Sequence, residues 1–247
     1  VGKVEIYVYD TSSDSWNRRL NYIGDGAANS KLGSSITISD DGTIVAAGRP
    51  GPDQGSDPTE AGSVYFFTGD TSSGGNYQFA GQISSTDMQG SYADSQSSNF
   101  GNSLAMSADG NVVFIGSNES HELLDGSGGT DSELTVGAVY RYTITDWMSF
   151  AYTADSEYFK GIRTLDRFGT AIATDGTGQT LAVYAAGKGG SGDTDFGRVQ
   201  AFSNKSGNWT AIGSSFIQQD DVQILNGECV SLSYNGKVLA ISNPAER

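Results

Sequence analysis

The sequence predicts an all-β fold assembled from four copies of one structural unit. Three observations indicate this fold. The composition, with 34 glycines, 4 prolines and only 17% charged residues, suits many tight turns rather than helices. A hairpin pattern occurs four times, and a second strand pattern precedes each hairpin. A unit that recurs along the chain in this way is typical of a repeat architecture.

The repeated hairpin is clearest in "FGNSLAMSADGNVVFIG", residues 100–116, where two alternating apolar stretches flank a tight turn. The other copies occupy residues 32–48, 168–184 and 226–242. In every copy a first glycine precedes a turn glycine by nine residues, and the pairs are Gly33 and Gly42, Gly101 and Gly110, Gly169 and Gly178, and Gly227 and Gly236. Because glycine accepts the positive φ that tight turns demand, we expect the turn glycines to be structural.

The second landmark is a Gly-x-Val sequence followed by valine and aromatic residues at alternate positions, a pattern typical of a β-strand. It begins at Gly2, Gly62, Gly137 and Gly197. An aromatic residue follows each landmark inside a further strand-like stretch, and these residues are Trp16, Tyr77, Trp147 and Trp209. We therefore predict about four strands in each repeat, with the aromatic side chains filling the space between neighbouring sheets.

Four-stranded units of about 60 residues, arranged radially, form a β-propeller in which each blade buries its faces against its neighbours. A β-solenoid is the alternative repeat fold, but its coils are far shorter. We expect residues 1–247 to form one β-propeller domain or a propeller fragment, either a closed four-blade ring or an arc of a larger propeller. The chain starts in the second half of a repeat and ends in the first half, so these halves could pair to complete one blade.

The combination of Phe-Gly, a Ser-x-Asp-Gly turn and an apolar strand ending in glycine resembles the FG-GAP repeats of integrin α-chain-like propellers and of their bacterial and algal relatives. The resemblance covers nearly the whole chain and implies extracellular adhesion, ligand binding or scaffolding. The sequence departs from the family at the calcium loops, because its turns hold only one or two carboxylates, as at Asp41 and Asp109. We expect these carboxylates to bond to the turn backbone rather than to enclose a cation.

No cofactor is expected to be required, and calcium has one candidate site. Among the acidic loops, Asp193 and Asp195 flank a single residue and form the best pair for calcium. The formal net charge of −15 argues against nucleic-acid binding, which depends on clustered lysine and arginine. No apolar run approaches the roughly 20 residues that span a bilayer, so we expect no direct membrane insertion.

Three observations bear on cellular location. The chain opens on Val1 rather than methionine, as expected of a processed product or a piece of a longer protein. Sequons at Asn118, Asn204 and Asn208 suit a secreted glycoprotein. The single Cys229 has no partner for an internal disulfide, and its apolar alternation predicts a buried thiol. We expect an extracellular or cell-surface protein.

Catalytic signatures are weak. His121 is the only histidine and lies in a polar stretch, which predicts a solvated loop side chain. Residues 187–192 fit Gly-x-Gly-x-x-Gly, but a strand-like sequence follows where a dinucleotide site requires a helix. With 29 acidic residues many carboxylate pairs exist, and none stands out for glycoside chemistry.

The sequence therefore predicts a non-enzymatic extracellular scaffold or adhesion propeller that mediates protein–protein, matrix or filament assembly. Its partners would be other proteins of a surface assembly, including copies of itself. Long loops at residues 51–61, 86–98, 118–136 and 187–196 are the candidate contact regions. The alternative is a carbohydrate-binding or glycan-hydrolysing propeller with its site at the propeller mouth, which exposed aromatic residues beside carboxylates would favour. A third hypothesis is a subunit of a larger assembly whose end strands complete a blade in a partner.

Overall fold

The computed structural model confirms an all-β fold. It describes residues 2–24, 31–51, 62–72, 74–87, 98–119, 121–123, 133–155, 159–162, 166–187, 197–205, 207–217 and 229–242. Apart from one turn of 3-10 helix, η2 (Ser85–Asp87), the described elements are β-strands. None of the helical residues in these ranges forms a segment long and apolar enough to cross a membrane.

Three antiparallel sheets contain the four strands expected of a repeat. The first runs β3 (Ser35–Ile38), β4 (Ile44–Arg49), β5 (Ser63–Gly69) and β6 (Tyr77–Ser84). The second runs β7 (Leu104–Met106), β8 (Val112–Ser117), β11 (Ala138–Asp146) and β12 (Ala151–Ala154), and β13 (Phe159–Lys160) also pairs with β11. The third runs β14 (Phe168–Thr174), β15 (Thr180–Ala185), β16 (Arg198–Lys205) and β17 (Asn208–Ile217).

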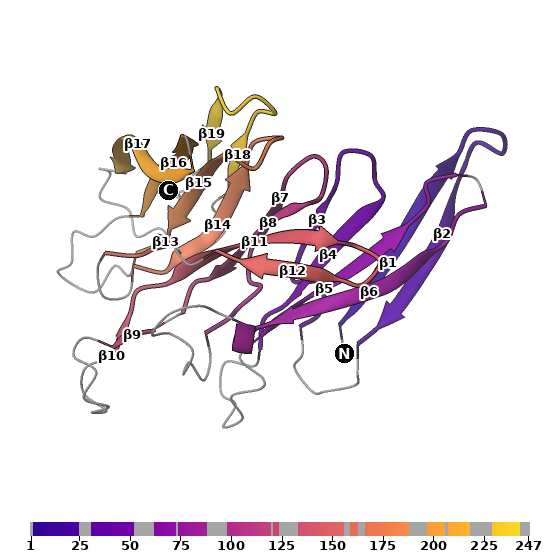
Figure 1. The fold of residues 1–247 in the computed structure, drawn as a ribbon, viewed down its shortest axis with the longest axis horizontal. Coiled ribbons are helices and arrows are strands. Elements are labelled where there is room, and N and C mark those ends of the chain that lie inside the picture. The colour runs from indigo at the N-terminus through magenta and orange to yellow at the C-terminus, as the bar shows by residue number, and fades with distance from the viewer. Residues whose placement is uncertain are drawn as a thin grey trace, which may run out of the picture.

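A two-stranded sheet stands before and after these three. The N-terminal hairpin pairs β1 (Lys3–Asp10) with β2 (Ser15–Ile23), and the C-terminal hairpin pairs β18 (Val230–Leu232) with β19 (Leu239–Ile241). A small hairpin of β9 (His121–Leu123) and β10 (Glu133–Thr135) lies within the second repeat. Figure 1 shows the sheets side by side in a row, with the N-terminal and C-terminal hairpins at its opposite ends.

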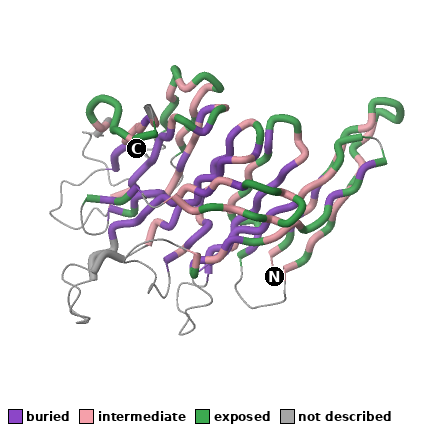
Figure 2. Tube along the Cα trace, viewed as in Figure 1, coloured by how far each residue is buried: buried purple, intermediate pink, exposed green. Residues whose placement is uncertain are grey.

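Among the described residues, three gaps between neighbouring sheets each hold a hydrophobic core. Val4 and Ile6 of the N-terminal hairpin pack on Val45 and Phe67 of the first sheet. Two further clusters, one between the first and second sheets and one between the second and third, are built in the same way. Figure 2 shows that the central strands are largely buried while the hairpin tips are exposed. This stacking of sheets through their faces resembles the arrangement of successive propeller blades.

The structure corrects two expectations about the aromatic landmarks. Trp147 lies in the turn between β11 and β12 rather than in a strand, although it still packs on Phe66 of the preceding sheet at 5.9 Å between ring centroids. Trp16 does not fill a gap between sheets, because 68% of it is exposed and no sheet lies on that side of the N-terminal hairpin among the described residues. Tyr77 and Trp209 are packed as expected.

Cys229 is exposed rather than buried. Ser35 and Ser103 lie two positions after Gly33 and Gly101, and Cys229 lies two positions after Gly227. In the first two repeats this position faces the following sheet. No sheet follows the C-terminal hairpin in the described part of the chain, so the thiol is left uncovered.

Candidate functional site

The tips of the repeated hairpins are fixed by one pattern of hydrogen bonds. In the second repeat, the Ser107 hydroxyl donates to Asp109 Oδ1 at 2.6 Å and accepts from the Val112 amide at 2.9 Å, while the Asn111 amide donates to Asp109 Oδ1 at 3.1 Å. Gly110 completes the turn with a φ of 76°. The carboxylate therefore bonds to its own turn, as the sequence predicted.

The other repeats keep this pattern with different residues. Asp41 accepts from the Thr43 amide at 2.9 Å and from the Ser39 hydroxyl at 2.7 Å, and these hydrogen bonds hold the pKa of Asp41 below its usual range. Asn235 takes the same role in the last repeat. In the third repeat the two positions are exchanged. Asp175 occupies the position of Ser107 and Thr177 that of Asp109, and the Thr177 hydroxyl donates to the Asp175 carboxylate.

Replacing Ser107 by alanine should lower the free energy of unfolding by about 1 to 3 kcal/mol, because it leaves the buried Val112 amide without its acceptor. Urea denaturation measures this change. Ser233→Ala is the matched control, since Ser233 makes the equivalent bonds in an exposed turn. An equal loss in both variants would contradict the importance of burial.

A relay of backbone hydrogen bonds joins the four tips. The Asp40 amide donates to the Ala108 carbonyl at 2.8 Å, the Ala108 amide to the Gly176 carbonyl at 2.9 Å, and the Gly176 amide to the Tyr234 carbonyl at 2.8 Å. These four residues occupy the same position in their repeats. The relay therefore brings one end of each repeat to a common region of the molecule.

An open pocket of about 540 Å³ lies where the tips meet. Its lining comes from all four hairpin turns and consists of Asp40, Asp41, Ala108, Asp109, Gly176, Thr177 and Tyr234. Three carboxylates give it a negative character, and Tyr234, a residue that is 67% exposed, adds an aromatic ring. Within the described residues no group of three histidine, cysteine or acidic side chains is arranged to hold a metal ion.

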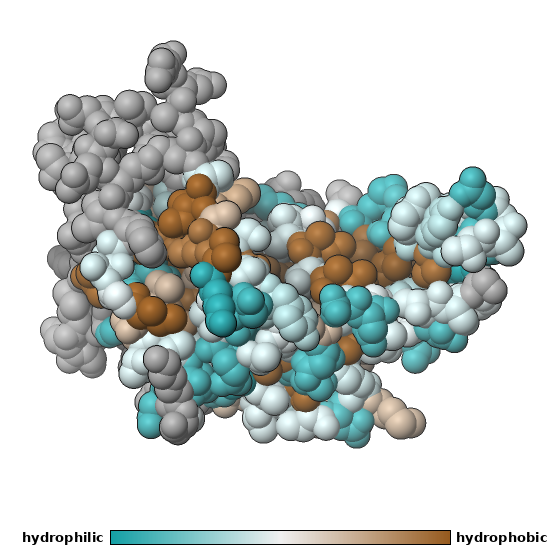
Figure 3. Space-filling view, turned by 90° about the horizontal axis from the view of Figure 1, so that it is seen from above, coloured by the Kyte–Doolittle hydropathy of each residue, from teal (hydrophilic) through white to brown (hydrophobic). Residues whose placement is uncertain are grey.

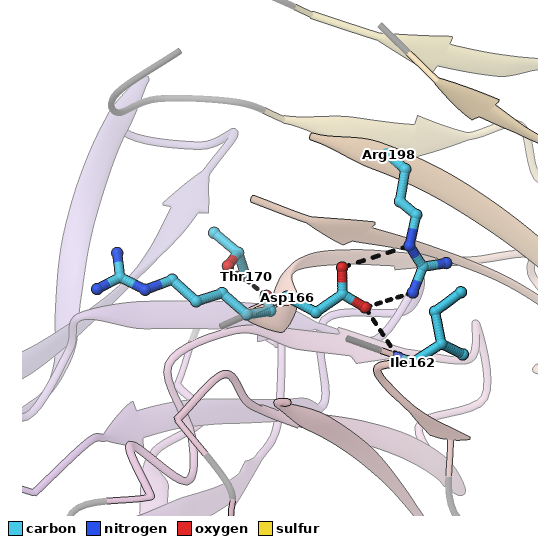
Figure 4. Close-up of polar contacts among 5 residues, drawn as sticks. Ile162, Asp166, Thr170 and Arg198 are labelled. Carbon is cyan, nitrogen blue, oxygen red and sulfur yellow. Dashed lines mark hydrogen bonds and ion pairs between the residues drawn. The ribbon is translucent and has the colours of Figure 1, made fainter. Parts of the chain in front are cut away.

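A buried ion pair lies in the third repeat, at the end of the sheet opposite to its hairpin turn (Figure 4). Arg198 Nη2 donates to Asp166 Oδ2 at 2.5 Å, and the Ile162 amide donates to the same oxygen at 3.0 Å. The guanidinium carbon also lies 5.6 Å from the centroid of the Phe168 ring. Because both charged side chains are buried, they tie the start of β14 to the start of β16.

The predicted site residues are spread over the structure. Asn208 is exposed at the start of β17, whereas Asn204 is half-buried with its amide oxygen Oδ1 buried. The Asn118 side chain approaches Asn99 at 3.4 Å and Thr170 at 3.5 Å. Asp193, Asp195 and Gly227 lie outside the described residues, as does most of each predicted contact loop.

One recurring backbone feature was missed at the sequence level. A residue with positive φ lies two positions before the first glycine of three repeated hairpins. These residues are Lys31, Asn99 and Arg167, with φ values of 49°, 54° and 50°. Their carbonyls accept from the amides of Ser34, Asn102 and Thr170. Two of these residues are cationic and the third is an asparagine, so no single residue type marks the turn, and only the common position could have revealed it.

The two ends of the row leave apolar side chains exposed. Trp16 contacts Tyr9 at 5.3 Å between ring centroids on the outer face of the N-terminal hairpin. On β3, 60% of Ile36 and 58% of Ile38 are exposed, and on the C-terminal hairpin 64% of Val238 is exposed. Figure 3 shows hydrophobic side chains gathered in patches on the face seen from above. Exposed apolar surface of this kind marks candidate interaction sites.

These features define a repeat protein of stacked four-stranded antiparallel sheets that resembles propeller folds. No protein-family model matches the chain, that of FG-GAP repeats included, and no curated protein matches it. The fold is similar to those of the periplasmic gluconolactonase PpgL from Pseudomonas aeruginosa (13% identity, TM-score 0.44), the WD40 repeats of RRP9 (12%, 0.42) and the tricorn protease (12%, 0.49).

These alignments cover 98%, 85% and 97% of this chain respectively. The chain corresponds to 72% of the gluconolactonase but to only 44% of the RRP9 chain and 22% of the protease, so it spans less than half of the latter two.

Proposed function

We propose that the chain is a non-enzymatic assembly module of an extracellular scaffold or adhesion protein. The observation that carries this proposal is the exposed apolar surface at the two ends of the row. The extracellular location rests on the resemblance to FG-GAP repeats and on the sequons, of which Asn208 is exposed. We also propose an arc rather than a closed four-blade ring, because the terminal hairpins are separate two-stranded sheets at opposite ends (Figure 1).

A comparison between repeats supports an interface at these ends. Ile38 occupies the position of Met106, which is only 8% exposed because it packs against the sheet that precedes it. Ile38 has no inner strands beside it on that side within the described residues. Covering such a side chain is worth about 1.5 to 3 kcal/mol, so a partner seated there would gain several kilocalories per mole from a few residues.

Carbohydrate binding is the second candidate function, favoured by one observation. Tyr234 lies beside Asp40 and Asp109 in the pocket, which is an aromatic residue next to carboxylates. Hydrolysis is less well supported than binding. Burial raises the pKa of Asp109, but the hydrogen bonds from Ser107 and Asn111 outweigh it and leave that pKa below the usual value. A carboxylate with a lowered pKa is a poor general acid for glycoside cleavage.

A glycan array with a hydrolysis readout separates the two functions. The assembly proposal predicts neither cleavage nor binding that depends on the pocket. The variant Tyr234→Ala alters the pocket, while Trp16→Ala, far along the row, is the control. Glycan binding that is lost in Tyr234→Ala and kept in Trp16→Ala would overturn the proposal in favour of the carbohydrate function.

A further inference from the structure

In every complete sheet the second strand of the repeat pairs with the third strand, and we call this strand pairing the joint. The paired strands are β4 with β5, β8 with β11, and β15 with β16. The register is the same each time. The residue two positions after the turn glycine pairs with the residue six positions after the Gly-x-Val glycine, as Ile44 pairs with Thr68 and Val112 with Thr143. The joint is therefore a property of the repeat.

The two ends of the row each carry one half of this joint. β1 follows a Gly-x-Val landmark, as β5 does, yet it pairs only with β2 among the described strands. β19 follows a turn glycine, as β4 does, and pairs only with β18 in the same ranges. An open strand edge presents unpaired backbone donors and acceptors and is a template for another strand.

We propose that β19 of one molecule pairs with β1 of a second copy of this chain and completes a four-stranded blade across the interface. The repeat register assigns Val238 to Val8, Leu239 to Tyr7 and Ala240 to Ile6. The inference rests on the proposed assembly function and names its partner.

The side chains that this pairing brings together are complementary. Within the chain, Ile44 and Ala46 pack with Met106 of the next sheet, and Leu104 packs against the same cluster. In the assembly, Val238 and Ala240 take the places of Ile44 and Ala46. They would cover Ile36 and Ile38 of the second copy, which occupy the positions of Leu104 and Met106. Three of the most exposed aliphatic side chains are thereby buried together.

The backbone relay between hairpin tips continues across the same interface. Within the described residues the relay begins at Asp40 and ends at Tyr234. With β19 on β1 of a second copy, the C-terminal hairpin lies beside β3 and β4 of that copy. The Tyr234 amide can then donate to the Asp40 carbonyl, which adds one more link with the geometry of the three links already present.

Cys229 provides an independent marker of this contact. The Ser35 hydroxyl donates to the Gly101 carbonyl at 2.7 Å, and the Ser103 hydroxyl donates to the Gly169 carbonyl at 2.7 Å. Cys229 occupies the position of these serines, so in the assembly its thiol would face the Gly33 carbonyl of the second copy. An exposed thiol would become covered when two molecules associate.

A second copy is favoured over closure within one chain by the packing of the row. β1 and β19 lie at opposite ends of it (Figure 1), and three buried cores hold the N-terminal hairpin and the three complete sheets against one another. Bringing both ends of one molecule together would require these cores to be repacked, and close-packed interiors resist such shifts. A second molecule needs no such change.

Engineered disulfides test both the register and the partner. In a Cys229→Ser background, Val8→Cys is combined with Val238→Cys. The equivalent pair Ile44 and Thr68 adjoins the hydrogen-bonded pair Thr43 and Gly69, so it is a non-hydrogen-bonded pair whose side chains lie close together. The control combines Val238→Cys with Tyr7→Cys, whose side chains would point to opposite faces. Mild oxidation is followed by non-reducing electrophoresis and intact mass.

The proposal expects a disulfide between two chains in the first variant and little or none in the control. A disulfide within one chain would overturn the second-copy partner in favour of ring closure. Absence of any disulfide would overturn the inference as well. A second readout avoids substitutions in the strands: the reactivity of Cys229 with a thiol reagent in the unmodified protein should fall as protein concentration rises, and constant reactivity would count against the contact.

The proposed function can be tested separately from this inference. A protein that stays monomeric with unpaired cysteines, and that neither binds nor cleaves glycans, would exclude the second copy as partner. It would leave assembly with a different protein as the function. Pocket-dependent glycan binding would instead remove the assembly function itself.

Discussion

Replacing Asp166 by alanine is expected to lower the free energy of unfolding by about 3 to 5 kcal/mol. The change leaves the buried Arg198 guanidinium without its carboxylate and removes the acceptor of the Ile162 amide. An uncompensated buried charge is among the costliest single defects in a folded protein. Urea denaturation followed by tryptophan fluorescence measures the loss.

Asp155→Ala is the matched control for this prediction. Asp155 also pairs with an arginine, Arg141, but 27% of its side chain is exposed, so we expect a loss nearer 1 kcal/mol. The double variant Asp166→Ala with Arg198→Met should regain part of the stability, because no buried charge is then left unpaired. Equal losses in Asp166→Ala and Asp155→Ala would show that burial of the ion pair is not the cause.

Replacing Gly137 by alanine is expected to cost about 3 to 4 kcal/mol. Gly137 has a φ of 74°, which disfavours a side chain by 1 to 2 kcal/mol, and the new methyl group would overlap the Phe168 carbonyl of the next repeat. The same close approach occurs between Gly62 and Phe100. At Gly62 and Gly137 the Gly-x-Val landmark is thus a point where consecutive sheets meet backbone to backbone.

Gly207→Ala separates the two contributions. Gly207 has a comparable φ of 87°, but a methyl group there would meet no atom within 4 Å. Its replacement should cost only the backbone term, about 1 to 2 kcal/mol. If Gly137→Ala were no more destabilising than Gly207→Ala, the contact between sheets at this glycine would be unimportant.

The sequence predicted the repeat and its strands well because both depend on local chemistry. The turn glycines Gly42, Gly110, Gly178 and Gly236 all have positive φ, as tight turns require. The bonding of Asp41 and Asp109 to their own turns likewise follows from residues within a few positions. Such short-range features can be predicted from the sequence of one copy, and their recurrence in four copies strengthens the prediction.

The sequence predicted burial poorly at the ends of the row, because burial there depends on neighbours rather than on pattern. Trp16 and Trp209 follow the same landmark, yet Trp209 packs on Phe114 whereas Trp16 is exposed. Cys229 stands in an apolar alternation like that of the buried strands, but no described sheet covers it. A periodic pattern indicates which face of a strand is apolar and does not say whether another sheet is present to cover it.

The buried ion pair could not be predicted for a different reason. Arg198 is the variable residue of a Gly-x-Val landmark, where the other repeats have Lys3, Ser63 and Ala138. Asp166 lies 32 residues before it in the chain and belongs to no repeated motif. Nothing local distinguishes this aspartate from the other acidic residues, so only the folded arrangement reveals the pair.

Sedimentation equilibrium of the unmodified chain, under reducing conditions and over a range of concentrations, tests the central claim most directly. The claim is that the ends of the row are complementary halves of one blade that join between molecules. It predicts an average mass that rises from 25.9 kDa toward a whole multiple of that value as concentration increases. A mass of 25.9 kDa at every concentration would contradict it.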